Sequence, residues 1–175
     1  MPAGRLARLF VAVWPPEEIV ERLAGLDRPD VVGLRWTDRR QWHVTLRFLG
    51  RADAGETRRA LEGLAVSGAP VEAVVGPRVE RFGAQVLHVP VSGLDGVAAA
   101  AVAATGEVGE PPEDRRFAGH VTLARVAKRA HVDLRGLVGQ EITGTWPVSE
   151  VSLVRSRPSS SGATYEVVER FALTG

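Results

Sequence analysis

With 175 residues, of which 45% are hydrophobic and 25% charged, the chain has the composition of an ordinary globular protein and enough length for a real core. It contains no cysteine, which excludes disulfide bonds, thiolate nucleophiles and cysteine-based zinc sites. The net charge of +1 indicates no particular partner. No apolar run reaches the length of a membrane span. We therefore expect a cytoplasmic monomer without membrane contact, in which residues 1–175 form one domain of two lobes.

The first half of the chain reads as strands alternating with helices. Pro15 and Pro16 follow an apolar run and suit the first turn of a helix. Asp53 is a suitable N-cap for a second helix. In order, the expected elements are a strand at 5–14, a helix ending near Leu26, a short strand at 34–36, a strand from 44 that Gly50 closes, and a helix that carries Ala60, Leu61 and Leu64.

The second half of the chain is richer in strands. His88 falls inside one of them, and we interpret it as an ordinary strand histidine. Because strands and helices do not alternate regularly, the pattern favours an α+β fold. The sequence contains no glycine-rich dinucleotide or P-loop motif. In order, the expected elements are strands at 71–75, 79–82 and 86–91, a helix at 94–105, a strand after residue 120, a short helix at 133–138, and strands at 148–155 and 165–173.

One tetrapeptide occurs twice, as His43-Val44-Thr45-Leu46 and as His120-Val121-Thr122-Leu123. Both copies lie in short apolar runs that are typical of strands, and they are separated by about half the chain. Because side chains alternate along a strand, each histidine shares a face with the threonine two positions later. The spacing predicts two similar lobes, each contributing one motif strand to a shared cleft.

Two imidazoles that titrate near neutrality suit a general acid and a general base, and threonine hydroxyls can hold a phosphate. Arginines flank both motifs, which predicts a local positive field. By strand alternation Arg47 shares the face of His43, whereas Arg125 falls on the opposite face from His120 unless a bulge intervenes. Trp36, Trp42 and Phe117 are candidates for stacking on a base or for core packing.

The chain resembles the 2H phosphoesterases, and within them the RNA 2′,3′-cyclic phosphodiesterases of the LigT-like 2′-5′ RNA ligase group. The resemblance extends over nearly the whole chain. It includes the opening residues 5–13, both motifs with their flanks (43–50 and 117–125), and residues 151–156 and 162–167. One departure is Gly119, where the family commonly has proline before the second histidine.

The resemblance implies a bilobal, pseudo-symmetric α+β fold in which two antiparallel sheets line a central cleft, with helices outside. It also implies hydrolysis of an RNA 2′,3′-cyclic phosphate end to a 2′-phosphomonoester, without a metal or cofactor. His43 is then the proton donor to the 3′ oxygen, and His120 is the base that activates water. The expected substrate-binding residues are Thr45, Thr122, Arg47 and Arg125.

Three alternatives stay open at this point. The same chemistry could act on a small nucleotide that carries a cyclic phosphate. The protein could bind RNA ends without converting them. A metal site built from His43, His120 and an acid is a third possibility, although neither motif contains an aspartate or glutamate.

Overall fold

The computed structural model describes residues 4–64 and 70–173, and ten strands within these ranges form one antiparallel sheet. Along its main path the strand order is β10-β9-β1-β3-β7-β6-β4-β8, with β2 added on β7 and β5 added on β6. The strands are β1 (Leu6–Val13), β2 (Leu34–Trp36), β3 (Val44–Asp53), β4 (Val71–Val75), β5 (Glu80–Phe82), β6 (Val86–Ser92), β7 (His120–Val126), β8 (Gly144–Val148), β9 (Glu150–Arg157) and β10 (Thr164–Ala172).

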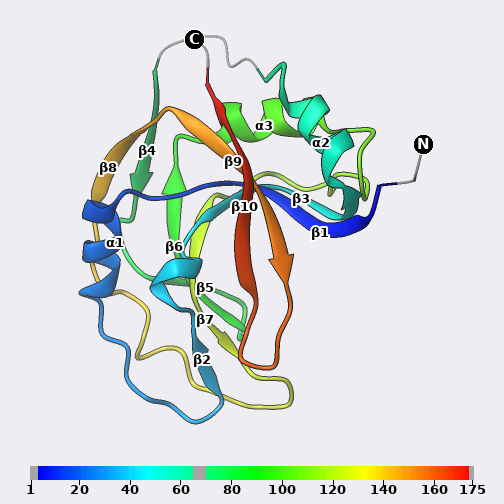
Figure 1. Cartoon of the computed structure of the whole chain (residues 1–175). Coiled ribbons are helices and arrows are strands. Elements are labelled where there is room, and N and C mark those ends of the chain that lie inside the picture. The colour runs from blue at the N-terminus through cyan, green and yellow to red at the C-terminus, as the bar shows by residue number, and fades with distance from the viewer. Residues whose placement is uncertain (1–3, 65–69, 174–175) are drawn as a thin grey trace.

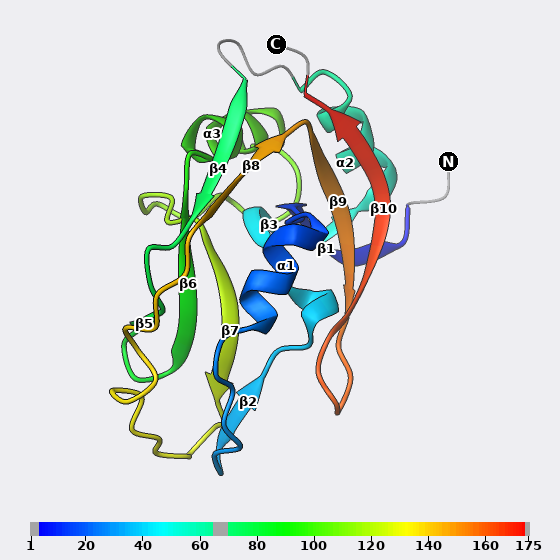
Figure 2. The ribbon, with the colours of Figure 1, turned by 90° about the vertical axis from the view of Figure 1, so that its left-hand side faces the viewer.

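The sheet consists of two arms that curl toward each other. The first arm contains β10, β9, β1 and β3, and the second contains β7, β6, β4 and β8. Figure 2 shows the second arm on one side of the molecule and the hairpin of β9 and β10 on the other. Among the described residues, Val44 of β3 and Val121 of β7 are the one register pair between the arms. The expected sheets are thus halves of one continuous sheet, and the α+β class is confirmed.

In the described residues three α-helices cover the sheet: α1 (Glu17–Ala24), α2 (Ala54–Leu61) and α3 (Asp95–Ala104). A short 3₁₀ helix, η1 (Arg39–Gln41), precedes β3. Figure 1 shows α2 and α3 together at one end of the molecule, where both pack against β3. Helix α1 packs against β8 and buries Ile19 and Leu23. Within the described residues no helix is long and apolar enough to cross a membrane.

Local sequence explains where two of these helices begin. Asp53 accepts a hydrogen bond from the Glu56 backbone N–H at 2.8 Å and is the N-cap of α2, as its position predicted. Pro16 is the N-cap residue of α1, and Glu17 and Glu18 in the first turn interact favourably with the helix dipole.

Three expectations about elements were wrong. Residues 133–138 contain a turn at 135–137 instead of a helix, and Gly136 in the middle of this short segment disfavours a helix. Strand β8 was missed, since Gly144 and Pro147 argue against a strand. Strand β3 does not end at Gly50, which continues the strand with a φ of 62°.

Candidate active site

The two His-Val-Thr-Leu motifs lie side by side on β3 and β7. Val44 and Val121 face each other in an antiparallel pair. Continuing this register by one residue in each direction places Thr45 beside His120 and Thr122 beside His43. Each imidazole therefore neighbours the threonine of the other motif. We call the side of the sheet that carries these four residues the histidine face.

His43 has both ring nitrogens engaged. Its Nδ1 lies 2.6 Å from the Gln41 carbonyl oxygen, and its Nε2 lies 3.0 Å from Oγ1 of Thr45. Because a carbonyl oxygen can only accept, Nδ1 carries a hydrogen and donates it. Nε2 is then the nitrogen that exchanges protons with a ligand on the histidine face.

Three aromatic side chains surround His43. The ring centroids of Phe10, Tyr165 and Trp14 lie 4.9, 5.1 and 5.4 Å from the imidazole. Phe10 belongs to β1, Trp14 directly follows β1, and Tyr165 belongs to β10. In the first arm β1 lies between β9 and β3, and β10 pairs with β9. This enclosure removes water from the ring and favours its neutral form.

His120 has a different environment. Its Nδ1 donates to the Ala118 carbonyl oxygen at 2.8 Å, so Nε2 is again the nitrogen available for proton transfer. The Phe82 ring contacts it edge-on at 4.8 Å, and the His88 ring at 5.4 Å. On the side that precedes it in the chain, the Gly119 carbonyl accepts from the Val91 backbone N–H at 2.8 Å.

Gly119 fits a position where no side chain has room. A Cβ atom there would lie 2.4 Å from the Val91 carbonyl oxygen, well inside van der Waals contact. A glycine in place of the family's proline would by itself loosen the backbone before His120. Instead, its missing side chain allows β6 to approach and hold this backbone by a hydrogen bond.

All three histidines of this region have lowered pKa values. Burial is the main cause for His43, whose pKa falls to about 4, and the charges of His120 and Arg125 lower it further against the opposing bond to Gln41. Burial also lowers the pKa of His120, with Arg125 acting in the same direction. For His88, burial followed by the charge of His120 lowers the pKa to about 4. Without a ligand, these imidazoles are neutral at pH 7.

A hydrogen-bond chain connects the two motifs behind the histidine face. Trp42, which precedes His43, is buried and donates from Nε1 to Oγ1 of Thr37 at 3.0 Å. The Thr37 hydroxyl donates to the Thr122 carbonyl oxygen at 2.8 Å. Trp42 is thus a core residue, and its indole fixes the first motif relative to the second.

Arg47 does not lie on the histidine face, so the prediction from strand alternation was wrong. The pairing of β1 with β3 shifts register at this point: Ala12 pairs with Thr45, but Val11 pairs with Arg47. The shift turns the Arg47 side chain toward the core, where it is only 4% exposed. Its guanidinium donates to backbone carbonyls of the loop after α3, including that of Glu110 at 2.6 Å. Arg47 therefore anchors this loop.

A similar register shift has the opposite effect on Arg125 and brings it onto the histidine face. His88 pairs with Thr122, but Leu87 pairs with Ala124, so Leu123 is the extra residue. This shift brings Arg125, an exposed residue, to the side of His120 and Thr122. Its charge acts on both imidazoles. A bulge thus resolves the conflict between strand alternation and the family resemblance.

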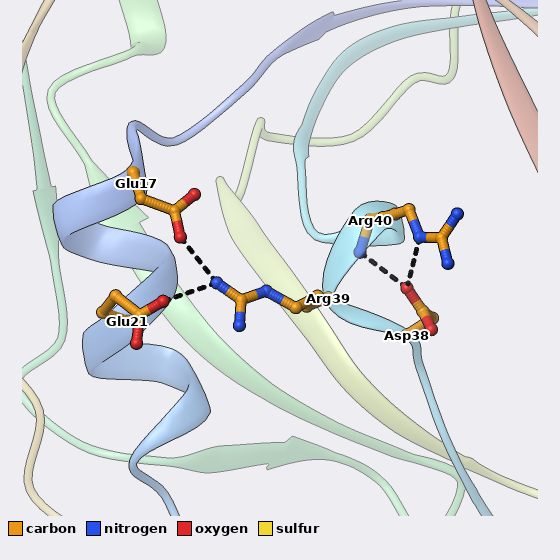
Figure 3. A network of polar contacts seen from close by, with 5 residues as sticks. All are labelled: Glu17, Glu21, Asp38, Arg39 and Arg40. Carbon is orange, nitrogen blue, oxygen red and sulfur yellow. Dashed lines mark hydrogen bonds and ion pairs between the residues drawn. The ribbon is translucent and has the colours of Figure 1, made fainter.

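Two other arginines near the first motif, Arg39 and Arg40, are paired with neighbouring acids. Arg39 donates to Glu17 at 2.7 Å and to Glu21 at 2.6 Å, so it joins the turn before His43 to α1 (Figure 3). Arg40 lies 3.6 Å from Asp38 in the same network. The positive field expected around the motifs is therefore narrower than the sequence indicated.

The sequence did not identify the aromatic residues that surround the two histidines. His88 was expected to be an ordinary strand histidine, but it lies against His120. His88 is 3% exposed and stacks on Phe82 at a centroid distance of 3.7 Å. Phe10 and Trp14 belong to a continuous apolar run, in which nothing marks one face as functional. Alternation from Phe10 through Ala12 to Trp14 was the signal that was available.

The two histidines have no cluster of further metal ligands around them. Within residues 4–64 and 70–173, no group of three or more histidine, cysteine, aspartate or glutamate side chains is arranged to hold a metal ion.

Comparisons with known proteins identify the family. The sequence model of the 2'-5' RNA ligase superfamily matches residues 14–159. A protein of Thermus thermophilus named RNA 2',3'-cyclic phosphodiesterase is 31% identical over 191 residues, which cover 96% of this chain and 91% of the relative.

Solved structures share the fold. A crystal structure of a Thermus thermophilus protein superposes with a TM-score of 0.77 at 29% identity, covering 95% of this chain and 97% of that chain. Escherichia coli LigT complexed with phosphate gives a TM-score of 0.68 at 25% identity, covering 98% and 100%. These matches confirm the resemblance carried by the two motifs, and the chain belongs to the 2'-5' RNA ligase superfamily.

Proposed function

We propose that this protein hydrolyses RNA 2′,3′-cyclic phosphate ends to 2′-phosphomonoesters, using His43 as general acid and His120 as general base. One observation carries the proposal: each imidazole donates its Nδ1 hydrogen to a backbone carbonyl, which leaves two Nε2 atoms for proton transfer in one site. The name of the Thermus relative and the family model support this activity.

The reaction needs one proton removed and one delivered. His120 takes a proton from water, whose oxygen forms the new bond to phosphorus. The bond from phosphorus to the 3′ oxygen breaks, and His43 gives that oxygen its proton. The phosphate stays on the 2′ oxygen. After turnover the proton has moved from one histidine to the other, so solvent restores the starting state.

Charge on the phosphate is balanced by neighbouring side chains. Thr45 and Thr122 provide hydroxyl donors for the phosphate oxygens, and Arg125 provides a positive charge. Donors placed where negative charge develops are a large source of catalysis in such sites. Arg47 has no part in this proposal, because its guanidinium is bonded to loop carbonyls.

The protonation of His43 depends on substrate. With a pKa of about 4 in the free protein, His43 is neutral at pH 7 and unable to act as an acid. An anionic phosphodiester beside the ring favours its charged form and raises this pKa. Substrate binding therefore charges the acid that the reaction requires.

Product analysis tests the proposal. A short RNA with a 2′,3′-cyclic phosphate end is incubated with the enzyme, and the product is identified by phosphorus NMR. We expect a 2′-phosphate. A 3′-phosphate would reverse the orientation of the substrate, and tight binding without conversion would favour a protein that only binds RNA ends.

Chelation tests the metal independence of this chemistry. The site supplies an acid and a base from its own side chains, so turnover is expected to continue unchanged after dialysis against EDTA. Loss of activity that zinc or manganese restores would instead support a metal site at His43 and His120.

A further inference from the structure

A hollow lined by arginines lies beside the His43 half of the site. Its volume is about 810 Å³, and it is bordered by the beginning of β1, the middle of β3 and the end of β9. Five of its lining residues are arginines, and Glu110 is the one acid among them. We call it the arginine hollow. The arginines are Arg5, Arg8, Arg51, Arg155 and Arg157.

The arginine hollow opens on the histidine face. Arg8 is two residues from Phe10 in β1, and the unbroken pairing of β1 with β9 keeps both on one side of the sheet. Phe10 contacts the His43 ring. Independently, Ser156 of the hollow pairs with Tyr165, which also contacts His43. Two strands therefore lead from the hollow to the imidazole.

The charge in this hollow is only partly balanced by the protein, because Glu166 pairs with Arg155 at 3.6 Å and with Arg157 at 3.0 Å. Arg8 of β1 lies directly opposite Arg51 of β3, and like charges opposite each other destabilise a strand pair. Among the described residues, none of the ion pairs includes Arg5, Arg8 or Arg51. A bound polyanion would relieve this repulsion.

An exposed aromatic ring lies within the same hollow. Phe48 is 39% exposed, and the Arg8 guanidinium is stacked over it at 5.2 Å from the ring centroid. Phe48 pairs with Phe10, so it too belongs to the histidine face. Arginines that follow a backbone and an aromatic ring that stacks on bases are the features by which proteins bind single-stranded RNA.

We propose that the arginine hollow binds the phosphodiester backbone of the nucleotides upstream of the cyclic phosphate, so that the preferred substrate is an RNA chain and not a mononucleotide. The inference rests on the proposed function for its orientation. A free polyphosphate ligand would share the chemistry of these contacts, but it would not connect the hollow to the cyclic end that the histidines process.

Salt dependence of binding tests the hollow without requiring turnover. The probe is a fluorescent short RNA with a 2′,3′-cyclic phosphate end, titrated against the His120→Ala protein at several salt concentrations. Adding Arg8→Gln and Arg51→Gln removes two contacts, so the slope of log affinity against log salt should become shallower by about 0.7 for each. Arg170→Gln is the matched control, because Arg170 is an exposed β10 residue that pairs with Glu150 at 3.5 Å outside the hollow.

Kinetics with two substrates separate this inference from the proposed function. For the Arg8→Gln, Arg51→Gln protein, kcat/KM for the RNA should fall about tenfold or more relative to kcat/KM for adenosine 2′,3′-cyclic phosphate. Equal losses on both substrates, or an unchanged salt slope, would overturn the inference.

If no variant or wild-type protein hydrolyses either substrate but the salt slope still becomes shallower, the proposed function fails and the hollow remains an RNA-binding site. Inorganic triphosphate that displaces the mononucleotide as effectively as the RNA would instead indicate a free polyphosphate site and contradict the inference.

Discussion

The surroundings of His43 and His120 differ, although the two tetrapeptides are identical. His43 is enclosed by three aromatic rings and has both ring nitrogens engaged, one of them with its own Thr45. His120 is bonded through Nδ1 to Ala118 and lies against the Phe82 and His88 rings. The surroundings that distinguish the two histidines therefore come mainly from residues outside the repeat.

This difference gives the proposed acid and base roles a physical origin. The more enclosed ring loses its charge most readily in the free protein and regains it when an anion binds. Such a ring responds to substrate and suits the acid. The tests below remove or alter one side of the comparison at a time, beginning with the largest expected effect.

Removing either imidazole should nearly abolish turnover. His43→Ala and His120→Ala are each expected to lower kcat by about 10²–10⁴-fold, because each removes one proton-transfer group. Steady-state hydrolysis of a cyclic-phosphate RNA measures this, with circular dichroism as the check on folding. A folded variant that turns over near the wild-type rate would break the paired mechanism.

A methyl group at Gly119 should disturb only the His120 side. The new Cβ of Gly119→Ala would press on the Val91 carbonyl oxygen and shift the backbone before His120. Misplacement on the order of 1 Å can lower kcat by up to about a hundredfold.

Gly136→Ala is the matched control for this substitution, because no neighbouring atom lies within 4 Å of its added Cβ. We expect the control to keep wild-type kcat. Equal activity of both variants would show that the close approach of β6 does not position His120.

The pH profiles should separate the free and the bound protein. In the free protein burial lowers the pKa of both histidines, so the bell of kcat/KM should lie on the acid side of pH 6.5. Bound phosphate raises both values, so the bell of kcat should lie at higher pH, with limbs of about tenfold per pH unit. Because the two groups are coupled, the limbs belong to the pair. If the pH profiles of kcat/KM and kcat coincide, bound substrate does not raise the pKa of His43.

Acid should destabilise the fold through His88. Its folded pKa of about 4 lies below the unfolded value, so the unfolded chain binds more protons below pH 6.5 and stability is lost as the pH falls. At pH 5 this loss is about 2 kcal/mol for such a group. In His88→Phe, the free energy of unfolding from urea titrations should therefore fall less between pH 7 and pH 5.

His131→Phe is the control for this measurement, since His131 is exposed. It should lose as much stability as the wild type over the same pH range. If His88→Phe also loses the wild-type amount, the buried ring of His88 does not carry the penalty.

The sequence predicted correctly those features of the site and the fold that depend only on residues two or three positions apart. Period-two alternation placed His43 with Thr45 and His120 with Thr122, because no register shift falls within either His-x-Thr segment. The Asp53 cap was readable for the same reason, since its partner Glu56 is three residues away.

Two register shifts explain the errors at the arginines. Each inserts one residue just after a motif threonine, and from that point the alternation is reversed. Arg47 thereby left the histidine face and Arg125 joined it. A bulge depends on how two strands pair, so neither strand shows it by itself. The aromatic rings around His43 are equally non-local, since Phe10 and Tyr165 belong to opposite ends of the chain.

The hydrogen bonds of Thr37 constrain the length of the segment before His43 more strongly than its composition. The threonine side chain accepts from Trp42 and donates to the Thr122 carbonyl, so the number of residues from Thr37 to Trp42 determines where the imidazole is presented. Side chains in the exposed turn at residues 39–40 can be exchanged without changing that number. An insertion or deletion of one residue there would break the alignment of indole and hydroxyl and separate the two motifs. Lineages of this protein should therefore vary in the composition of this turn and keep its length.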